Sequence, residues 1–426
     1  MRVLVLGGYG LIGISILRAI ARKGWSPIGL GRSADLGRRL APQARWIGAD
    51  LAQMTEPSSW APLLDGVDAV VNASGALQDG ARDDLAAAQR AAIIALIAAC
   101  ETAGARRFVQ ISAPDARPEA ARGLPFYETK AAADAALRDS ALDWTILRPG
   151  LVISPTAYGA TSLLRMLAAA PLIQPIAHPG AQVQTVHVDD VADAATLCLT
   201  RPDAVGLDAD LIEDAPRRLD ALTAAFRSWL GFAPARATLA LPAWAAGAVA
   251  AGADVGGRLG WRSPLRSTAL KALERGVLGD PEPWRAFAGA PIRGLEDTLA
   301  RLPSTRQERI YARAQFAFPI LLLTLSAFWL ATGLITAARP EAAAAALQGS
   351  VSPAAAQTLV WSGVAVDLAI GAALLVRRWA RAACLAAVAV SLAYLGAGTA
   401  LTPQLWADPL GPLVKIFPTM ALAAIV

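Results

Sequence analysis

Apolar and polar positions change their spacing repeatedly over the first two hundred residues. A short apolar run at residues 3–6 is followed by glycines and then by a stripe in which Ile12, Ile16 and Ile20 share one helical face. Four residues suffice for a buried strand but not for a helix. The same alternation continues downstream, with expected strands at residues 27–30, 69–71, 107–112 and 144–147 and expected helices at 85–103 and 127–140. It predicts an α/β, doubly wound parallel-sheet Rossmann domain.

The pattern changes at residue 315. Four apolar stretches follow, each about long enough to cross a bilayer, at residues 316–337, 357–376, 382–401 and 409–426. They predict an all-α, four-helix transmembrane bundle. The earlier stretch 239–260 is also rich in alanine and glycine, but Pro242, Asp254 and Arg258 interrupt it, so we expect a helix of a small substrate lobe there.

These patterns divide the chain into two functional parts. We expect a nucleotide-binding domain at 1–300, with its substrate lobe mainly at 200–300. A linker at 301–315 then leads to a membrane domain at 316–426.

Composition narrows the possible functions. Of the 426 residues 55% are hydrophobic, and the net charge of +5 is spread along the chain with acidic residues interleaved. We expect attraction to a membrane surface and no nucleic-acid binding. Three widely separated cysteines form no metal-ligand spacing and no disulfide framework, which predicts no metal and a reducing compartment. We expect no signal peptide, because the first strand occupies residues 1–6.

Three glycines separate the first strand from the first helix. Gly7 permits a tight turn, Gly10 allows a pyrophosphate to approach closely, and Gly13 lets helix and strand pack together. The helix N-terminus supplies N–H groups for the anion. The arrangement predicts dinucleotide binding.

The end of the second strand indicates which dinucleotide is preferred. An NAD site usually places an acidic residue there, whereas this chain has Arg32. A guanidinium suits a 2′-phosphate, so NADP(H) is the expected cofactor, with NAD(H) possible. The alternative is a solvated arginine at a strand end.

The G-x-x-G-x-x-G spacing resembles that of the extended, epimerase-like and atypical short-chain dehydrogenase/reductases. Matching segments occur at residues 48–51, 70–75, 111–113, 147–150 and 186–192. In the last of these, N-capping of the next helix explains Asp189 and Asp190 at least as well as ligand binding. The resemblance implies a catalytic Ser112. It also implies a set of cofactor-binding residues: Gly7, Tyr9, Gly10, Leu11, Ile12, Gly13, Arg32, Asp50, Leu51, Asn72, Ala73, Ser74, Gly75, Lys130 and Pro149.

The catalytic pair departs from the family pattern. Active members place a tyrosine four residues before a lysine, and the lysine lowers the tyrosine pKa and holds the ribose. Here the residue four before Lys130 is Phe126, while Tyr127 is offset by about 100° around the helix. Catalysis would then use Ser112 with an off-register Tyr127 and Lys130. The chain therefore resembles the atypical branch, which includes NmrA-like NADP sensors and the nucleotide-binding accessory subunit of respiratory complex I.

The membrane half resembles the DoxX-like four-helix domain through residues 361–371 and 405–415. Asp367 lies near the middle of the second expected span, where a carboxylate is costly. It serves either helix packing through a hydrogen bond or a functional role toward a head group or proton.

Two functions are open on these grounds. The first is a membrane-anchored NADP(H)-dependent oxidoreductase acting on a lipophilic quinone or lipid-like carbonyl. The second is a non-catalytic NADP(H) sensor or membrane scaffold. Either would be a multi-pass protein of the cytoplasmic membrane with its N-terminal domain in the cytoplasm; the sequence does not fix the oligomeric state.

Overall fold

The computed structural model describes residues 1–75, 84–261, 263–347 and 349–426. The chain forms two compact units. The first comprises residues 1–251 and 264–312, and the second comprises residues 252–263 and 313–426.

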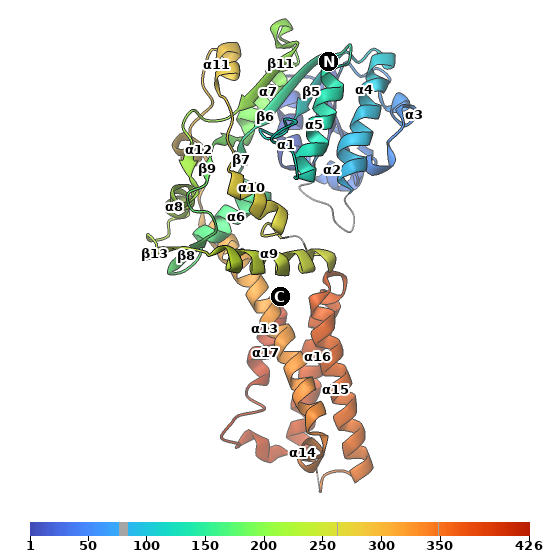
Figure 1. The fold of residues 1–426 in the computed structure, drawn as a ribbon. Helices are drawn as coiled ribbons and strands as arrows, with labels where there is room; N and C mark the ends of the chain where they lie inside the picture. The colour runs from blue at the N-terminus through green and yellow to red at the C-terminus, as the bar shows by residue number, and fades with distance from the viewer. Residues whose placement is uncertain (76–83, 262, 348) are drawn as a thin grey trace. The chain divides into compact units, whose positions relative to one another are not determined.

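The first unit is built on a seven-stranded parallel sheet (Figure 1). Its strands are β1 (Arg2–Leu6), β2 (Ser26–Gly31), β3 (Arg45–Gly48), β4 (Ala69–Asn72), β5 (Arg107–Ile111), β6 (Asp143–Pro149) and β11 (Leu207–Leu211). Their order is β11-β6-β5-β4-β1-β2-β3. The predicted doubly wound Rossmann architecture is confirmed. The strand order reverses between β1 and β4, which is where such sheets bind nucleotides.

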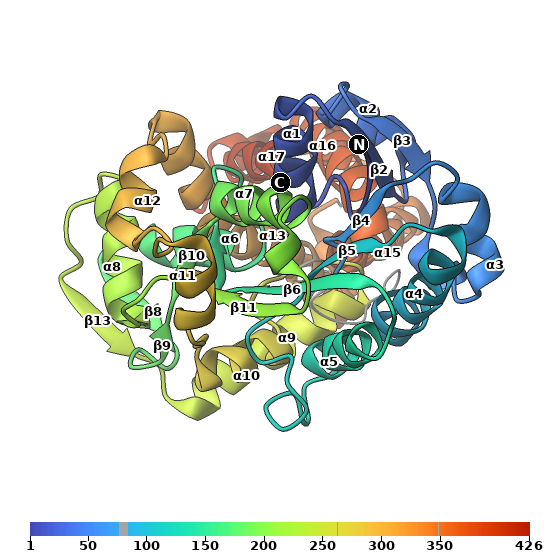
Figure 2. The same cartoon turned by 90° about the horizontal axis from the view of Figure 1, so that it is seen from above.

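Helices cover both faces of this sheet. Figure 2 shows α1 (Leu11–Arg22) and α7 (Val188–Cys198) on one side and α4 (Ala92–Ala103) and α5 (Pro125–Arg138) on the other. Strand β1 alternates accordingly, because its valines join the core under α1 and its leucines join the core under α4. A π-helical segment, Ala86–Ala91, precedes α4 where a continuous α-helix was expected. Short helices α2 (Ala34–Leu40) and α3 (Pro57–Trp60) complete the domain.

A smaller lobe follows the sheet. It contains three two-stranded sheets, β7 with β10, β9 with β12, and β8 with β13. The strands are β7 (Leu151–Ile153), β8 (Ile173–Ile176), β9 (Gln182–Val183), β10 (Thr185–His187), β12 (Arg217–Arg218) and β13 (Ala237–Ala240). The helices are α6 (Gly159–Ala168), α8 (Leu219–Trp229), α9 (Ala243–Arg258), α10 (Ser267–Arg275), α11 (Glu282–Ala288) and α12 (Leu295–Arg301). Buried Leu222, Phe226 and Leu299 belong to its own apolar core.

The second unit is helical. Helices α13 (Arg306–Ala338), α15 (Pro353–Leu375) and α16 (Arg377–Leu401) are long and apolar enough to cross a membrane. The short α14 (Pro340–Ala345) lies between the first two in sequence. The fourth expected span differs, because the structure has only α17 (Ile416–Ile425) there. Ten residues extend about 15 Å, half of a hydrocarbon core. Pro409, Gly411 and Pro412 account for the late start, since these residues disfavour a helix.

Candidate functional site

The glycine turn after β1 is held by close backbone approach. Gly7 has φ +65°, and a Cβ on Gly13 would lie 2.2 Å from the Gly7 carbonyl oxygen. The Gly10 N–H donates to that same oxygen at 2.8 Å. Any side chain at Gly13 would therefore push the start of α1 away from the sheet.

The start of α1 suits an anion. Its N-cap is Gly10, which offers no side-chain acceptor to the N–H groups of the first turn. Leu11 and Ile12 open the helix and are half-buried. A pyrophosphate would satisfy these donors. The residues present thus fit a dinucleotide, with Gly7, Gly10 and the α1 N-terminus as its cradle.

The end of β2 packs against the glycine turn. The Tyr9 ring covers Gly31, where a Cβ would lie 2.4 Å from the ring. The Tyr9 hydroxyl accepts a hydrogen bond from the Ser33 N–H at 3.2 Å. Arg32 lies between these residues in sequence and is exposed. Asp50 accepts from the Ala52 N–H at 3.2 Å and so caps the short turn that contains Leu51.

The loop after β4 is organised by Asn72. Its amide donates to Gln110 at 2.9 Å, and its carbonyl oxygen accepts from the Ser74 N–H at 3.0 Å. Ala73 and Gly75 flank this serine. The buried Asn72 side chain therefore shapes the start of this loop.

Lys130 of α5 reaches the carboxyl ends of two strands. Its ammonium donates to the Ile111 carbonyl at 2.9 Å and lies 3.5 Å from the Ser74 carbonyl. The side chain is buried. Burial lowers the pKa of the Lys130 ammonium to about 8, although the Asp134 carboxylate acts in the opposite direction. This places a titratable cation beside the predicted cofactor loop.

Phe126 occupies the position that faces Lys130. The ammonium lies 5.7 Å from the centroid of the Phe126 ring. Tyr127 packs edge-to-face on Phe126 instead, with ring centroids 5.0 Å apart. Burial raises the pKa of the Tyr127 hydroxyl to about 12; Asp115 adds to this effect and Arg275 opposes it. The side chain next to the cation is thus an aromatic ring without a hydroxyl.

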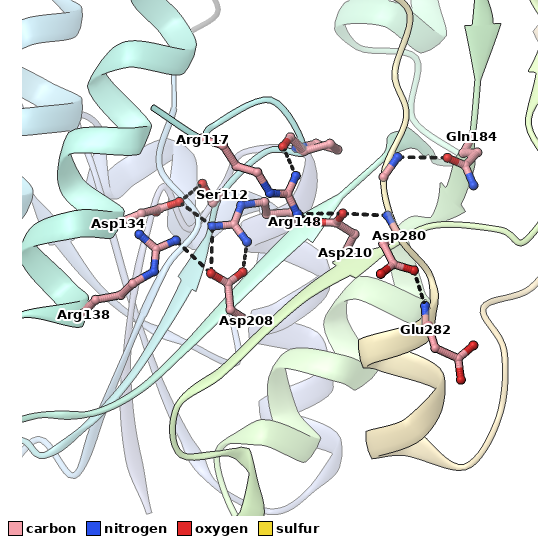
Figure 3. A network of polar contacts seen from close by, with 12 residues as sticks. Ser112, Arg117, Asp134, Arg138, Arg148, Gln184, Asp208, Asp210, Asp280 and Glu282 are labelled. Carbon is pink, nitrogen blue, oxygen red and sulfur yellow. Dashed lines mark hydrogen bonds and ion pairs between the residues drawn. The ribbon is translucent and has the colours of Figure 1, made fainter. Parts of the chain in front are cut away.

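Ser112 follows β5, but its hydroxyl is engaged inside the protein. It donates to the Asp134 carboxylate at 2.6 Å (Figure 3). Asp134 also pairs with Arg148 at 3.3 Å, and both side chains are fully buried. Asp208 pairs with the same arginine and with Arg138. Burial raises the pKa of the Asp134 carboxyl, while the Ser112 hydrogen bond and Arg148 oppose the rise.

Asp134 was missed by the sequence reasoning. It lies four residues after Lys130, on the same face of α5. The sequence shows the spacing between Lys130 and Asp134. It does not show that Arg148 of β6 is the partner of Asp134, because only the fold brings these two side chains together. Pro149, the predicted cofactor contact, ends that strand and is buried.

A second network of hydrogen bonds links the sheet to the smaller lobe. Arg117 donates to both oxygens of the buried Asp210 at 2.9 Å, and Asp210 also accepts from the Asp280 N–H (Figure 3). One residue earlier, the Gly279 N–H donates to Gln184 at 3.0 Å. The loop before α11 is therefore fastened to β11.

The acidic pair after β10 does not cap α7. The cap is His187, whose Nδ1 accepts from the Asp189 N–H at 3.1 Å. Asp190 pairs with Arg293 at 2.8 Å. The expectation that Asp189 or Asp190 caps this helix is wrong because the chain already enters α7 at Val188, before either aspartate.

Asp367 lies in the second unit and is buried. Its carboxylate accepts a hydrogen bond from the Tyr394 hydroxyl at 2.9 Å. This contact joins α15 to α16, which is the kind of hydrogen bond that the packing alternative requires.

Fold and site together define a nicotinamide-dinucleotide-binding Rossmann protein that carries a membrane domain. Residues 7–202 match the family described as NAD(P)H-binding, and residues 326–424 match the DoxX-like family. The chain belongs to the NAD(P)H-binding family, with a DoxX-like domain fused to it.

Two curated relatives are similar to the nucleotide-binding half. UPF0659 protein YMR090W of Saccharomyces cerevisiae is 32% identical over 162 residues, which cover 35% of this chain and 69% of that protein. Photosystem II assembly factor Ycf39 of Synechocystis is 33% identical over 152 residues, which cover 35% of this chain and 44% of the relative.

A solved structure shows the same fold. The UDP-glucose 4-epimerase of Thermus thermophilus, in complex with NAD, has a TM-score of 0.54 at 20% identity. The match covers 74% of this chain and 99% of the epimerase. The likeness shows an epimerase-type Rossmann fold.

Lys130 generates a pH-dependent prediction for cofactor binding. Below a pKa of about 8 the side chain is a cation that attracts an anionic dinucleotide, and above it the charge is lost. We expect NADPH affinity of the full chain to fall severalfold as pH rises from about 7 to about 9, a range in which phosphates no longer titrate. Fluorescence titration of NADPH measures it.

Two variants serve as controls. Lys130→Arg stays charged and should bind with little pH dependence, whereas Lys130→Met should bind weakly at every pH. An equally steep loss of affinity in Lys130→Met would show that another group is responsible.

Proposed function

We propose that the protein is a membrane-bound NADP(H)-dependent oxidoreductase whose substrate is a quinone. The observation that carries the proposal is the pairing of buried Lys130 with Phe126, in place of a tyrosine, at the carboxyl edge of the sheet. A nicotinamide cofactor bound at the glycine turn would exchange a hydride with the substrate.

The missing hydroxyl selects between two substrate classes. Reduction of a simple carbonyl leaves a strongly basic alkoxide, which needs a positioned acid. Reduction of a quinone leaves a phenolate-type oxygen, whose conjugate acid has a pKa of about 10, as in tyrosine. Such an oxygen needs no protein acid and can take its proton from solvent or from the Lys130 ammonium. A site without the tyrosine therefore favours a quinone over a lipid-like carbonyl.

The membrane domain supports the same substrate class. Quinones with long side chains dissolve in the bilayer, and the DoxX-like domain holds the enzyme there. The lipophilic substrate and the membrane anchor are thus consistent with each other.

A second function is favoured by the Ser112–Asp134 bond. A hydroxyl that satisfies a buried carboxylate is not free to polarise a substrate, and with Phe126 this describes a site that binds a cofactor without turnover. The relative from Synechocystis is named an assembly factor, which agrees with a sensor or scaffold role.

Turnover with two substrates distinguishes these functions. We expect the full chain in lipid nanodiscs to oxidise NADPH with a short-chain ubiquinone analogue and not with a long-chain aldehyde, followed by absorbance. Phe126→Tyr places a hydroxyl beside Lys130 and should permit aldehyde reduction, since a positioned acid contributes roughly 10²–10⁴-fold. If both the wild type and Phe126→Tyr bind NADPH without oxidising it, the oxidoreductase hypothesis is contradicted and the sensor or scaffold hypothesis is supported.

Tyr127→Phe tests the proton donor predicted from the sequence. A donor role requires a loss of about 10²-fold or more in quinone reduction. The quinone mechanism instead expects little change.

NADP(H) preference is proposed through Arg32. Charge-assisted hydrogen bonds to a 2′-phosphate contribute about 1.5–3 kcal/mol, so Arg32→Ala should weaken NADPH binding at least about tenfold and leave NADH unchanged. Calorimetric titration with both cofactors measures this. Arg22→Ala is the matched control, because Arg22 is exposed at the far end of α1. Equal affinity of the wild type for both cofactors would contradict the preference.

We also propose a cytoplasmic-membrane location with the nucleotide-binding domain in the cytoplasm. Basic residues cluster in the first turns of α13 and α16: Arg306, Arg309, Arg313, Arg377, Arg378 and Arg381. Segments 338–356 and 402–408 contain a single one, Arg339. The positive-inside bias supports this orientation.

Cysteine labelling of whole cells checks the orientation. Ala345→Cys should react with a membrane-impermeant maleimide from outside, and Trp379→Cys should react only after lysis. Both positions are exposed in the structure, so burial would not mimic protection. Labelling of position 379 in intact cells would contradict the proposed orientation and indicate the opposite one.

A further inference from the structure

Helix α5 is fastened to the end of β5 by two side chains that lie one turn apart. The Lys130 ammonium donates to the Ile111 carbonyl at 2.9 Å, and the Asp134 carboxylate accepts from the hydroxyl of the next residue, Ser112, at 2.6 Å (Figure 3). Residues four apart share one face of a helix, with Cβ atoms about 5–6 Å from each other. Two successive residues therefore hold the cation and the carboxylate side by side.

Both charged groups are shielded from water. Lys130 is 6% exposed, and Asp134 is fully buried. The ammonium donates to neutral carbonyl oxygens, those of Ile111 and Ser74, and neither bond neutralises its charge. A buried ammonium without an opposite charge loses its proton readily. The charge of Lys130 therefore depends on a carboxylate close to it.

Asp134 is the carboxylate in that position. Within the described residues, its charge is the one that acts on the Lys130 ammonium, and it favours the protonated form. Asp115, in the loop after β5, acts on the Tyr127 hydroxyl. Apart from Arg148, the other charged side chains of α5, of the helical segments packed on it and of strands β5 and β6 are exposed or bonded elsewhere: Arg90, Glu101, Arg107, Glu128, Arg138 and Asp143.

Arg148 keeps the Asp134 carboxyl ionised. A guanidinium stays protonated in proteins, and this one is fully buried between two carboxylates, Asp134 at 3.3 Å and Asp208. Burial raises the pKa of the Asp134 carboxyl, but the Ser112 hydrogen bond, Arg148 and Lys130 all oppose the rise. Asp208 belongs to β11 and pairs with Arg138 as well. Asp134 is therefore the carboxylate that Arg148 and Lys130 share.

We propose that Asp134 is the counter-ion that keeps Lys130 charged at the cofactor site. It is a positioning residue, because it is inaccessible to a ligand and acts through Lys130. The charged ammonium attracts an anionic dinucleotide.

The consequence for turnover rests on the proposed function. There the nicotinamide passes a hydride to the quinone, and the Lys130 ammonium gives a proton to the phenolate-type oxygen that results, which completes the quinol. The neutral Lys130 amine then takes a proton from solvent. Asp134 favours this last step, because it stabilises the ammonium that forms.

The pH profile of NADPH binding tests the counter-ion on the full chain. Asp134→Asn removes the charge and keeps the shape of the side chain. We expect the pH at which NADPH affinity has fallen by half to move to lower pH by about one unit or more, the effect of an opposite charge at this distance. At the acidic end of the profile Lys130 is protonated in both proteins, so the variant should bind NADPH at least as well as the wild type there. Fluorescence titration at a series of pH values measures the midpoint.

Asp208→Asn is the matched control. It also takes one carboxylate from Arg148, but Asp208 does not act on Lys130, so the midpoint should stay in place. If Asp134→Asn does not fold, the double variant Asp134→Asn/Arg148→Met removes both members of the buried pair and should show the same acid shift.

An unchanged midpoint in the Asp134 variants would overturn the proposal. An equal shift in Asp208→Asn would also overturn it, because the effect would then come from disturbing Arg148. The measurement does not depend on turnover. An acid shift in a chain that never oxidises NADPH would contradict the oxidoreductase and support Asp134 as the counter-ion of a cofactor-binding protein.

Discussion

The backbone contact between Gly7 and Gly13 is the constraint on which the nucleotide-binding half depends. A Cβ on Gly13 would meet the Gly7 carbonyl at 2.2 Å, and a Cβ on Gly7 would meet the Ala73 carbonyl at 2.8 Å. The start of α1, the turn after β1 and the loop after β4 therefore approach at backbone distance. Because Lys130 lies beside the Ser74 carbonyl in that same loop, a shift of the glycine turn would displace the cation as well.

The buried ion pair of Asp134 and Arg148 explains why the Ser112 hydroxyl is bonded inside the protein. Both charged side chains are inaccessible to water, and removing one partner of such a pair typically destabilises a protein by about 3–5 kcal/mol. The Ser112 hydroxyl supplies a further hydrogen bond to the carboxylate. A serine that turned toward a substrate would leave Asp134 with fewer donors. The atypical catalytic pattern therefore involves the packing beneath the site as well as the Phe126 substitution.

The sequence predicted what local patterns determine. Short apolar runs identified five of the seven strands of the sheet, but not β3 or β11. Counting four residues back from Lys130 identified Phe126 as its neighbour. Contacts between distant elements could not be predicted this way, as Asp134 and Arg148 illustrate. The π-helical segment before α4 and the late start of α17 were not predicted either. The late start depends on prolines, which an average of hydrophobicity over the whole stretch conceals.

Hydrophobicity alone does not separate membrane helices from core helices in this chain, but the share of each apolar helix that the rest of the protein buries does. The apolar helical stretch 86–103, which includes α4, is long and apolar enough to qualify as a span, with a mean hydropathy of 1.3. It lies against the sheet, and 44% of that stretch is buried by the protein. Helix α16 reaches 1.8 with only 17% of its apolar window buried. The uncovered apolar area of α16 is stable only where another apolar medium replaces water.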